Sequence, residues 1–157
     1  MLSFLKNLIK TKTLSKENLR NIATEYAWTL LGLPYRWGGN DPMEGLDCSG
    51  TCIEIGKSVA IFPRSYDNSA GGIWEEFVKY RVQSPYQGCF VLFHHPDDKN
   101  KIIHIAFCID EFHMIEAGGG GSATLTMEDA KKQDAYIMLR PIASRKYIAG
   151  YVDPFLR

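Results

Sequence analysis

Apolar residues in the first half of the chain recur at the spacing of amphipathic helices. In residues 15–31 they would share one helical face: Leu19, Ile22, Ala23, Tyr26, Ala27, Leu30 and Leu31. Gly32 and Pro34 would end this helix. The same periodicity predicts a second helix over residues 48–62 and a third, shorter one over residues 69–80. The first half of the chain is therefore predicted to be mainly helical.

The second half of the chain changes to a strand-like pattern. Residues 88–93 and 101–109 are apolar, β-rich runs bounded by polar turns, and residues 114–117 and 135–140 look like further strands. Helices followed by strands predict an α+β fold, because a parallel βαβ array would alternate the two. The 157 residues contain no internal repeat and no long linker, so a single domain over residues 1–157 is expected.

Charge and segment composition exclude several classes of protein. Lys plus Arg and Asp plus Glu both number 18, so the formal net charge is zero and no nucleic-acid partner is predicted. Polar residues interrupt residues 1–10, which predicts a short amphipathic helix there instead of a signal peptide. No run approaches the length of a membrane-spanning helix, so no membrane partner is expected. The sequence predicts a protein made in the cytoplasm.

The four cysteines are not interpreted as disulfides or metal ligands. Disulfides need an oxidising compartment, and no export signal is visible. No Cys or Cys/His spacing is typical of a zinc site, so no metal and no cofactor are predicted. Cys52, Cys89 and Cys108 are interpreted as small buried hydrophobic residues. Cys48 differs because it follows a loop rich in Gly, Pro, Asn and Asp, residues 34–50, and begins a predicted helix.

This position gives Cys48 the features of a nucleophile. A thiol at a helix N-terminus lies near the positive end of the helix dipole and near unpaired backbone N–H groups. Both favour the thiolate, so the pKa of Cys48 is expected to fall below the free value of about 8.5. The backbone N–H of Cys48 is also the natural donor to an oxyanion. The alternative is a cysteine that only packs beneath the loop.

His104 is the best candidate for the base among the four histidines. His94 and His95 stand where a strand meets a polar loop, and His113 lies near another polar turn. His104 instead interrupts an apolar strand, where a buried imidazole needs hydrogen-bond partners. Pairing with a cysteine would make it a general base and acid. A core histidine satisfied by its neighbours is the alternative.

Glu116 is the candidate for the third group, which would fix the tautomer of His104. It stands on the strand that follows the His104 strand after a tight turn, so the hairpin register decides whether Glu116 and His104 lie on the same face of the sheet. An odd loop, for instance residues 110–112, pairs residues 106 and 116 and puts Glu116 on the face of His104. A two-residue loop turns Glu116 to the other face, where a solvent-exposed glutamate is the expected outcome.

These residues stand in two motifs at a specific separation. Pro34-Tyr-Arg-Trp-Gly-Gly39 is followed by Asp47-Cys-Ser-Gly50, then by the strand histidine and by a third polar residue twelve positions later. Over about residues 20–120 this pattern resembles the NlpC family of papain-like cell-wall peptidases, in its phage- or prophage-type single-domain form. The resemblance implies a papain-like fold whose nucleophile begins a helix packed on an antiparallel sheet of about five strands.

The same resemblance implies an activity and further site residues. Cys48 would attack an amide bond of a peptidoglycan stem peptide, between γ-D-glutamyl and a diamino acid, and form a thioester. The remaining candidates follow from matched motif positions: Tyr35 beside the oxyanion or substrate, Asp47 and Ser49 at the substrate's amino end, and Arg64 in a Pro-Arg-Ser segment. Loop packing is the alternative for Tyr35, a helix cap the alternative for Asp47, and a loop buttress the alternative for Arg64.

The sequence departs from the family pattern at two places, and rival functions stay open. Glu116 stands where histidine is frequent, and Gly88-Cys89 replaces the usual Gly-Asp. Residues 118–122, Gly-Gly-Gly-Gly-Ser, are interpreted as a flexible loop beside the site. A thiol amidase or acyltransferase would use the same thioester, and a non-catalytic phage tail protein would keep only the fold. Phage-type motifs also predict phage tail proteins as partners and virion-associated delivery to the cell wall.

Overall fold

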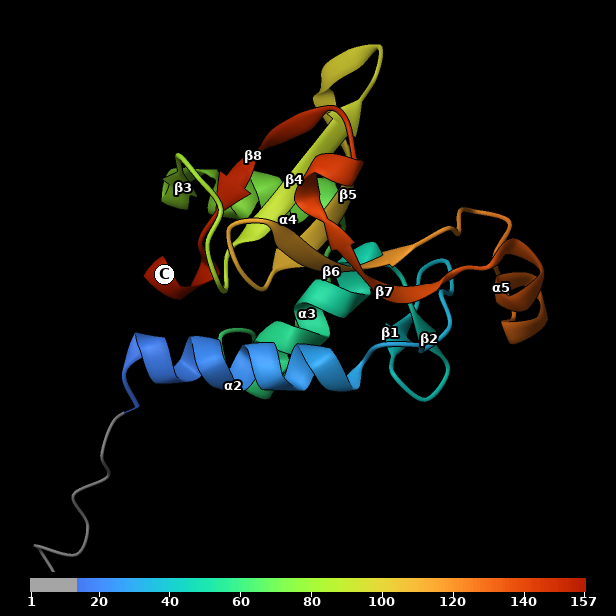
Figure 1. Ribbon diagram of the computed structural model, residues 1–157, viewed down its shortest axis with the longest axis horizontal. Helices are drawn as coiled ribbons and strands as arrows, with labels where there is room; N and C mark the ends of the chain where they lie inside the picture. The colour runs from blue at the N-terminus through green and yellow to red at the C-terminus, as the bar shows by residue number, and fades with distance from the viewer. Residues whose placement is uncertain (1–13) are drawn as a thin grey trace, which may run out of the picture.

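A computed structural model describes residues 14–157, which form four α-helices and a six-stranded antiparallel sheet (Figure 1). The helices are α2 (Lys16–Thr29), α3 (Cys48–Ser58), α4 (Ala70–Phe77) and α5 (Met127–Gln133). The first three confirm the helices expected from the apolar periodicity, whereas α5 was not predicted. The helix expected within residues 1–10 lies outside the described residues. Within residues 14–157, no helix combines the length and the apolar character needed to cross a bilayer.

Each of these helices begins directly after a side chain that can cap it. Ser15, Asp47, Ser69 and Thr126 each accept a hydrogen bond from a backbone N–H in the first turn. Such a cap satisfies one of the N–H groups that the helix itself leaves unpaired. The polar residues at these four positions therefore determine where the helices start, including the start at Cys48.

The sheet has six strands, not the five or so that were expected. In space their order is β3-β8-β4-β5-β6-β7, all antiparallel. Their bounds are β3 (Arg81–Val82), β4 (Phe90–His95), β5 (Asp98–Cys108), β6 (His113–Gly118), β7 (Tyr136–Pro141) and β8 (Ile148–Val152). Strands β3 and β8 were missed because the first has only two residues and the second contains Ala149 and Gly150, which are poor strand formers.

The central strands carry two different apolar faces. Residues Phe90, Leu92, Ile105, Phe107 and Ile115 face α3 and α4 and join the main core, and α2 packs on the far side of α3. Figure 1 shows α2 at the edge of the molecule, with α3 between it and the sheet. The alternate residues, among them Val91, Phe93, Ala106 and Met114, form a second cluster on the opposite face.

One irregularity of the sheet positions the site. Strands β5 and β6 pair only at Phe107–Ile115 and Cys108–Met114, next to their hairpin. Beyond these two pairs β5 stays with β4 and β6 stays with β7, so the two strands separate. The helix α3, which packs against both β5 and β6, begins with Cys48. The backbone edge of β5 near His104 is therefore open toward the nucleophile candidate.

Candidate active site

Asp47 fixes the turn that presents Cys48. Its Oδ1 accepts hydrogen bonds from the backbone N–H of Gly50 (2.7 Å) and from the hydroxyl of Ser49 (2.9 Å), and its Oδ2 accepts from the N–H of Gly38 (3.1 Å). Asp47 is thus the N-cap of α3, which was the alternative interpretation of this residue. The N–H of Cys48, as the first of the helix, has no partner within the helix and stays available to an oxyanion.

The charge state of Cys48 differs from the sequence-based expectation. Burial and the neighbouring Asp47 carboxylate raise the pKa of its thiol to about 12, although the backbone N–H groups of Ile105, Ser49 and Cys48 act in the opposite direction. The predicted lowering was therefore wrong. The helix terminus does stabilise the thiolate, but desolvation and a capping carboxylate outweigh it. The contribution of Ile105 also places the sulfur beside the residue that follows His104.

His104 and Glu116 form a buried hydrogen-bonded pair. Nε2 of His104 and Oε2 of Glu116 are 2.6 Å apart, and the side chain of Glu116 is completely buried. The hairpin has the odd register: Ile109 N–H bonds the His113 carbonyl oxygen, which leaves residues 110–112 as the loop. Glu116 therefore lies on the face of His104. Since a carboxylate accepts, Nε2 carries the proton and Nδ1 is left free as a base.

Two arginines near Glu116 were missed by the sequence analysis. Arg145 donates from Nε to Glu116 Oε2 at 2.6 Å, and Nε of Arg140 lies 3.5 Å from Oε1. Oε1 itself has no hydrogen-bond partner within the described residues. Neither arginine belongs to the two motifs, and both stand more than twenty residues after Glu116 in the chain. A buried carboxylate on a strand is the only signal that could have suggested a nearby cation.

The surroundings of the pair keep the imidazole neutral. Burial lowers the pKa of His104 and the Arg145 charge lowers it further, although the hydrogen bond to Glu116 opposes this. For Glu116, burial disfavours the carboxylate, but His104 and Arg145 together lower its pKa. At neutral pH the resting groups are a neutral thiol, a neutral imidazole and a carboxylate. In general, a neutral imidazole is the form that can act as a base toward a neutral thiol.

Tyr35 lies under the glycine-rich segment and close to Cys48. Its side chain is buried, and burial, followed by the charges of Cys48 and Asp47, raises its pKa well above the ordinary value. A Cβ atom on Gly120 would overlap the Tyr35 ring, and one on Gly118 would lie 3.2 Å from Oε1 of Glu116. The glycine run is thus beside the site, as expected, although its first residue, Gly118, is the last residue of β6 and not part of a loop. Its glycines allow close approach to Tyr35 and to Glu116.

A small polar cavity adjoins the start of α3. It has a volume of about 270 Å³ and is lined by Gly38, Gly39, Asp47, Ser49, Gly50, Asp67, Asn68 and Ser69. The Ser49 side chain is mostly buried and Asp67 is exposed. Among the described residues, two carboxylates and no cationic side chain line the cavity, so it is suited to a positively charged group. Asp47 and Ser49 therefore lie both in the capping turn and in the wall of this cavity.

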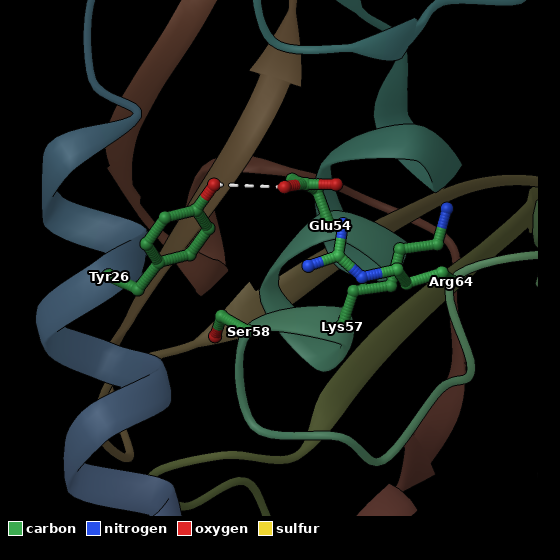
Figure 2. A pocket seen from close by; sticks show the side chains of 5 residues that line it. All are labelled: Tyr26, Glu54, Lys57, Ser58 and Arg64. Carbon is green, nitrogen blue, oxygen red and sulfur yellow. Dashed lines mark hydrogen bonds between the residues drawn. The ribbon is translucent and has the colours of Figure 1, made fainter.

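The structure does not bring Arg64 to this group of residues. Figure 2 shows Arg64 with Tyr26, Glu54, Lys57 and Ser58 around a separate cavity of about 410 Å³. Glu54, Lys57 and Ser58 belong to the C-terminal half of α3, whereas Cys48 is its first residue. In this cavity the Tyr26 hydroxyl donates to Glu54 at 3.0 Å. Arg64 is therefore placed at the C-terminal half of α3, and the structure does not support a direct role for it at the nucleophile, which begins the helix.

The remaining cysteines and histidines lie as the sequence indicated. Cys52, Cys89 and Cys108 are fully buried, so Cys48 is the one partly exposed thiol of the four. His94 and His95 are partly exposed at the end of β4, and His113 contacts Asp110 in the hairpin. Among residues 14–157, no three or more His, Cys, Asp and Glu side chains are grouped so that they could hold a metal ion.

Comparison with known proteins adds a family and a fold. A model of the NlpC/P60 family matches residues 32–140, which is more than half of the chain and includes Cys48, His104 and Glu116. Several solved structures share the fold. An NlpC/P60 family protein from Bacillus cereus is 24% identical with a TM-score of 0.63, and the match covers 85% of this chain and 38% of that one.

Two further structures are similar in the same way. A lipoprotein-like NLP/P60 family protein from Staphylococcus aureus is 18% identical with a TM-score of 0.64, covering 89% of this chain and 42% of that one. The peptidoglycan hydrolase RipB from Mycobacterium tuberculosis is 16% identical with a TM-score of 0.64, covering 88% of this chain and 65% of that one. At these identities the similarities establish the shared fold, and the matches span well under half of the first two proteins.

Proposed function

Since the chain belongs to the NlpC/P60 family, we propose that it is a cysteine peptidase that cleaves stem peptides of peptidoglycan. One observation carries the proposal. The buried His104–Glu116 pair, at 2.6 Å, lies where β5 and β6 separate, next to the helix that begins with Cys48. A thiol, a base and a group that fixes the base are the parts that nucleophilic cysteine catalysis needs.

The proposed reaction proceeds through a thioester. The Cys48 sulfur attacks the carbonyl carbon of an amide while Nδ1 of His104 accepts the thiol proton, and the backbone N–H of Cys48 stabilises the oxyanion. The C–N bond then breaks as His104 gives its proton to the departing amine. A water molecule, deprotonated by His104, attacks the thioester and releases the acid, and the proton returns to Cys48. Glu116 stabilises the imidazolium in both steps.

The polar cavity beside Ser49 supports a substrate with a free amino group. Asp47 and Asp67 contribute two carboxylates, and no cation of residues 14–157 lines the cavity, which favours an ammonium group over a carboxylate. A stem peptide presents such a group at its amino end. The proposed bond is the one between γ-D-glutamyl and the diamino acid, as the sequence motifs imply. RipB, a structural neighbour, is named a peptidoglycan hydrolase, which agrees with this substrate class.

The test is digestion of purified sacculi of both common cross-link chemistries, with released fragments identified by mass spectrometry. Wild type should release peptides cut at one bond, whereas Cys48→Ala and His104→Gln should release none. Cys52→Ala is the matched control, because Cys52 lies one turn further along α3 and is fully buried. Release that survives Cys48→Ala would overturn the mechanism. New amide products formed when a free amine is added would instead indicate acyl transfer.

Delivery of the enzyme is a separate proposal that rests on sequence motifs alone. We propose virion-associated action at the cell wall, with phage tail proteins as partners, from the resemblance to phage-type members. Proteomics of purified virions from a producing strain would detect the chain in tail fractions. Its absence from virions that still digest sacculi through another protein would refute this proposal without affecting the peptidase assignment.

A further inference from the structure

The carboxylate of Glu116 is shared between the imidazole and a guanidinium group. We propose that Arg145 is a positioning residue of this site: it fixes the Glu116 carboxylate, so that Glu116 can hold the His104 ring with Nδ1 free for the Cys48 proton. The inference rests on the proposed peptidase function but concerns a residue outside both motifs. Arg145 lies between the 3₁₀ turn Ile142–Ser144 and β8, far from Cys48 in sequence.

The geometry around Oε2 supports a fixed orientation. Nε2 of His104 and Nε of Arg145 both approach this one oxygen at 2.6 Å, while Oε1 has no hydrogen bond within the described residues. Rotation of the carboxylate would therefore break both hydrogen bonds together. The Arg145 guanidinium also lies over the Phe93 ring, 5.8 Å from its centroid, and that ring is 5.7 Å from the imidazole. Phe93 thus contacts both partners of Glu116 and limits their movement.

The positive charge of Arg145 compensates for the loss of solvation of the buried Glu116 carboxylate. The Glu116 side chain is completely buried, and a carboxylate so far from water needs a cation or several donors to stay ionised. The charged and titratable groups that influence the His104–Glu116 pair come from several elements: Asp47 before α3, Arg140 on β7 and Arg145 after it. Cys52 of α3 also lies within reach of the Glu116 charge. Of the two arginines, only Arg145 hydrogen-bonds the carboxylate, at the oxygen that also bonds His104.

Arg140 is the natural matched control. Its Nε lies 3.5 Å from Oε1 of Glu116, but it donates to the Met138 sulfur at 2.9 Å, and its side chain is 44% exposed against 32% for Arg145. Arg145→Gln and Arg140→Gln remove the same charge near the same carboxylate. Only the first removes a hydrogen bond to it. A positioning role predicts different results for the two variants, whereas a general electrostatic effect predicts similar ones.

The first measurement needs no substrate. The titration of His104 is followed by NMR in the full-length protein, with its signal assigned through His104→Gln. Because the Arg145 charge lowers the pKa of His104, Arg145→Gln should raise its titration midpoint, and Arg140→Gln should move it far less. Arg145→Lys keeps the charge without the fork geometry and should give an intermediate midpoint. Equal shifts in both glutamine variants, or none in either, would overturn the proposal. Thermal unfolding identifies any variant that fails to fold, and Arg145→Lys then decides.

The second measurement uses cleavage of a soluble stem peptide across pH. His104 must be neutral to act as base, so Arg145→Gln should move the acid limb of kcat/KM to higher pH and lower kcat by about 10- to 100-fold, with KM little changed. Arg140→Gln should keep the wild-type profile. If wild type cleaves no peptide, the proposed function fails while the NMR result still tests Arg145. If wild type cleaves and Arg145→Gln has an unchanged profile, only the positioning role fails.

Discussion

Glu116→Gln is the most informative single substitution at this site. The amide has the shape of the carboxylate, and its oxygen can take the place of Oε2 and accept from both His104 and Arg145, but its NH2 group then lies at the Oε1 position and the negative charge is gone. Both charge-assisted hydrogen bonds become ordinary ones, a weakening of about 1 kcal/mol each, and the Arg145 guanidinium loses its counter-charge. Because the Arg145 side chain is 32% exposed and can regain water, we expect a loss of about 3 kcal/mol in unfolding free energy.

Urea denaturation at pH 7 measures this loss, and a thermal midpoint lower by about 6–12 °C should accompany it. Glu54→Gln is the matched control: Glu54 is partly buried and accepts one hydrogen bond from a neutral hydroxyl, that of Tyr26, so about 1 kcal/mol is expected. The kcat of Glu116→Gln should fall by about 10²–10⁴, since an amide can select the wrong imidazole tautomer.

The pH dependence of the difference in unfolding free energy between wild type and Glu116→Gln provides a sharper test. The pKa of Glu116 is lowered from its ordinary 4.5, so its charged form contributes stability that is fully present above 4.5. That contribution is lost as the pH falls through the lower, folded-state pKa. The free-energy difference between wild type and Glu116→Gln should therefore be constant at pH 6–8 and shrink in acid. A difference below about 1 kcal/mol at pH 7, or one that does not shrink in acid, would refute the buried-carboxylate reasoning.

Three further predictions concern the nucleophile and its supports. Because the pKa of Cys48 is raised to about 12, its alkylation by iodoacetamide should accelerate about tenfold per pH unit from pH 7 to 10. A plateau of the alkylation rate near neutral pH would contradict this, and Cys48→Ser should abolish the labelling. Asp47→Ala should lower the free energy of unfolding in urea by about 1 kcal/mol, because it removes a helix cap. It should also speed the alkylation of Cys48 at pH 8, because the Asp47 carboxylate raises the pKa of the thiol. Ser15→Ala, which removes the cap of α2, should lower stability without changing the alkylation rate. Gly120→Ala should lower the free energy of unfolding in urea by about 1–3 kcal/mol, because the added methyl group overlaps the Tyr35 ring. Gly121→Ala should have little effect, because a Cβ atom there lies within 4 Å of no atom of the described residues.

Capping residues and apolar periodicity are sufficient to predict the local features of the site. A cap residue, a glycine-rich loop and an apolar helical pattern place Cys48 at the start of a helix, and a polar residue in an apolar strand distinguishes His104. Both depend on short-range rules of capping and periodicity, which a single chain displays directly. The α+β class follows from the change of period along the chain. Strands β3 and β8 were not predicted, because pairing with neighbouring strands, and not the β-propensity of their own residues, holds them in the sheet.

The way in which these groups come together depends on contacts that form only in the folded chain. The three-residue hairpin loop turns Glu116 toward His104, and a chain segment almost thirty residues later brings Arg145 to the same oxygen. Burial reverses the expected pKa shift of Cys48, because desolvation depends on everything packed around the thiol and not on its place in the helix. Arg64 stands in a family-like segment, yet it lines a cavity at the C-terminal half of α3, whereas the nucleophile candidate begins the helix. Register, burial and long-range contacts are cooperative properties of the packed chain, so no local pattern encodes them.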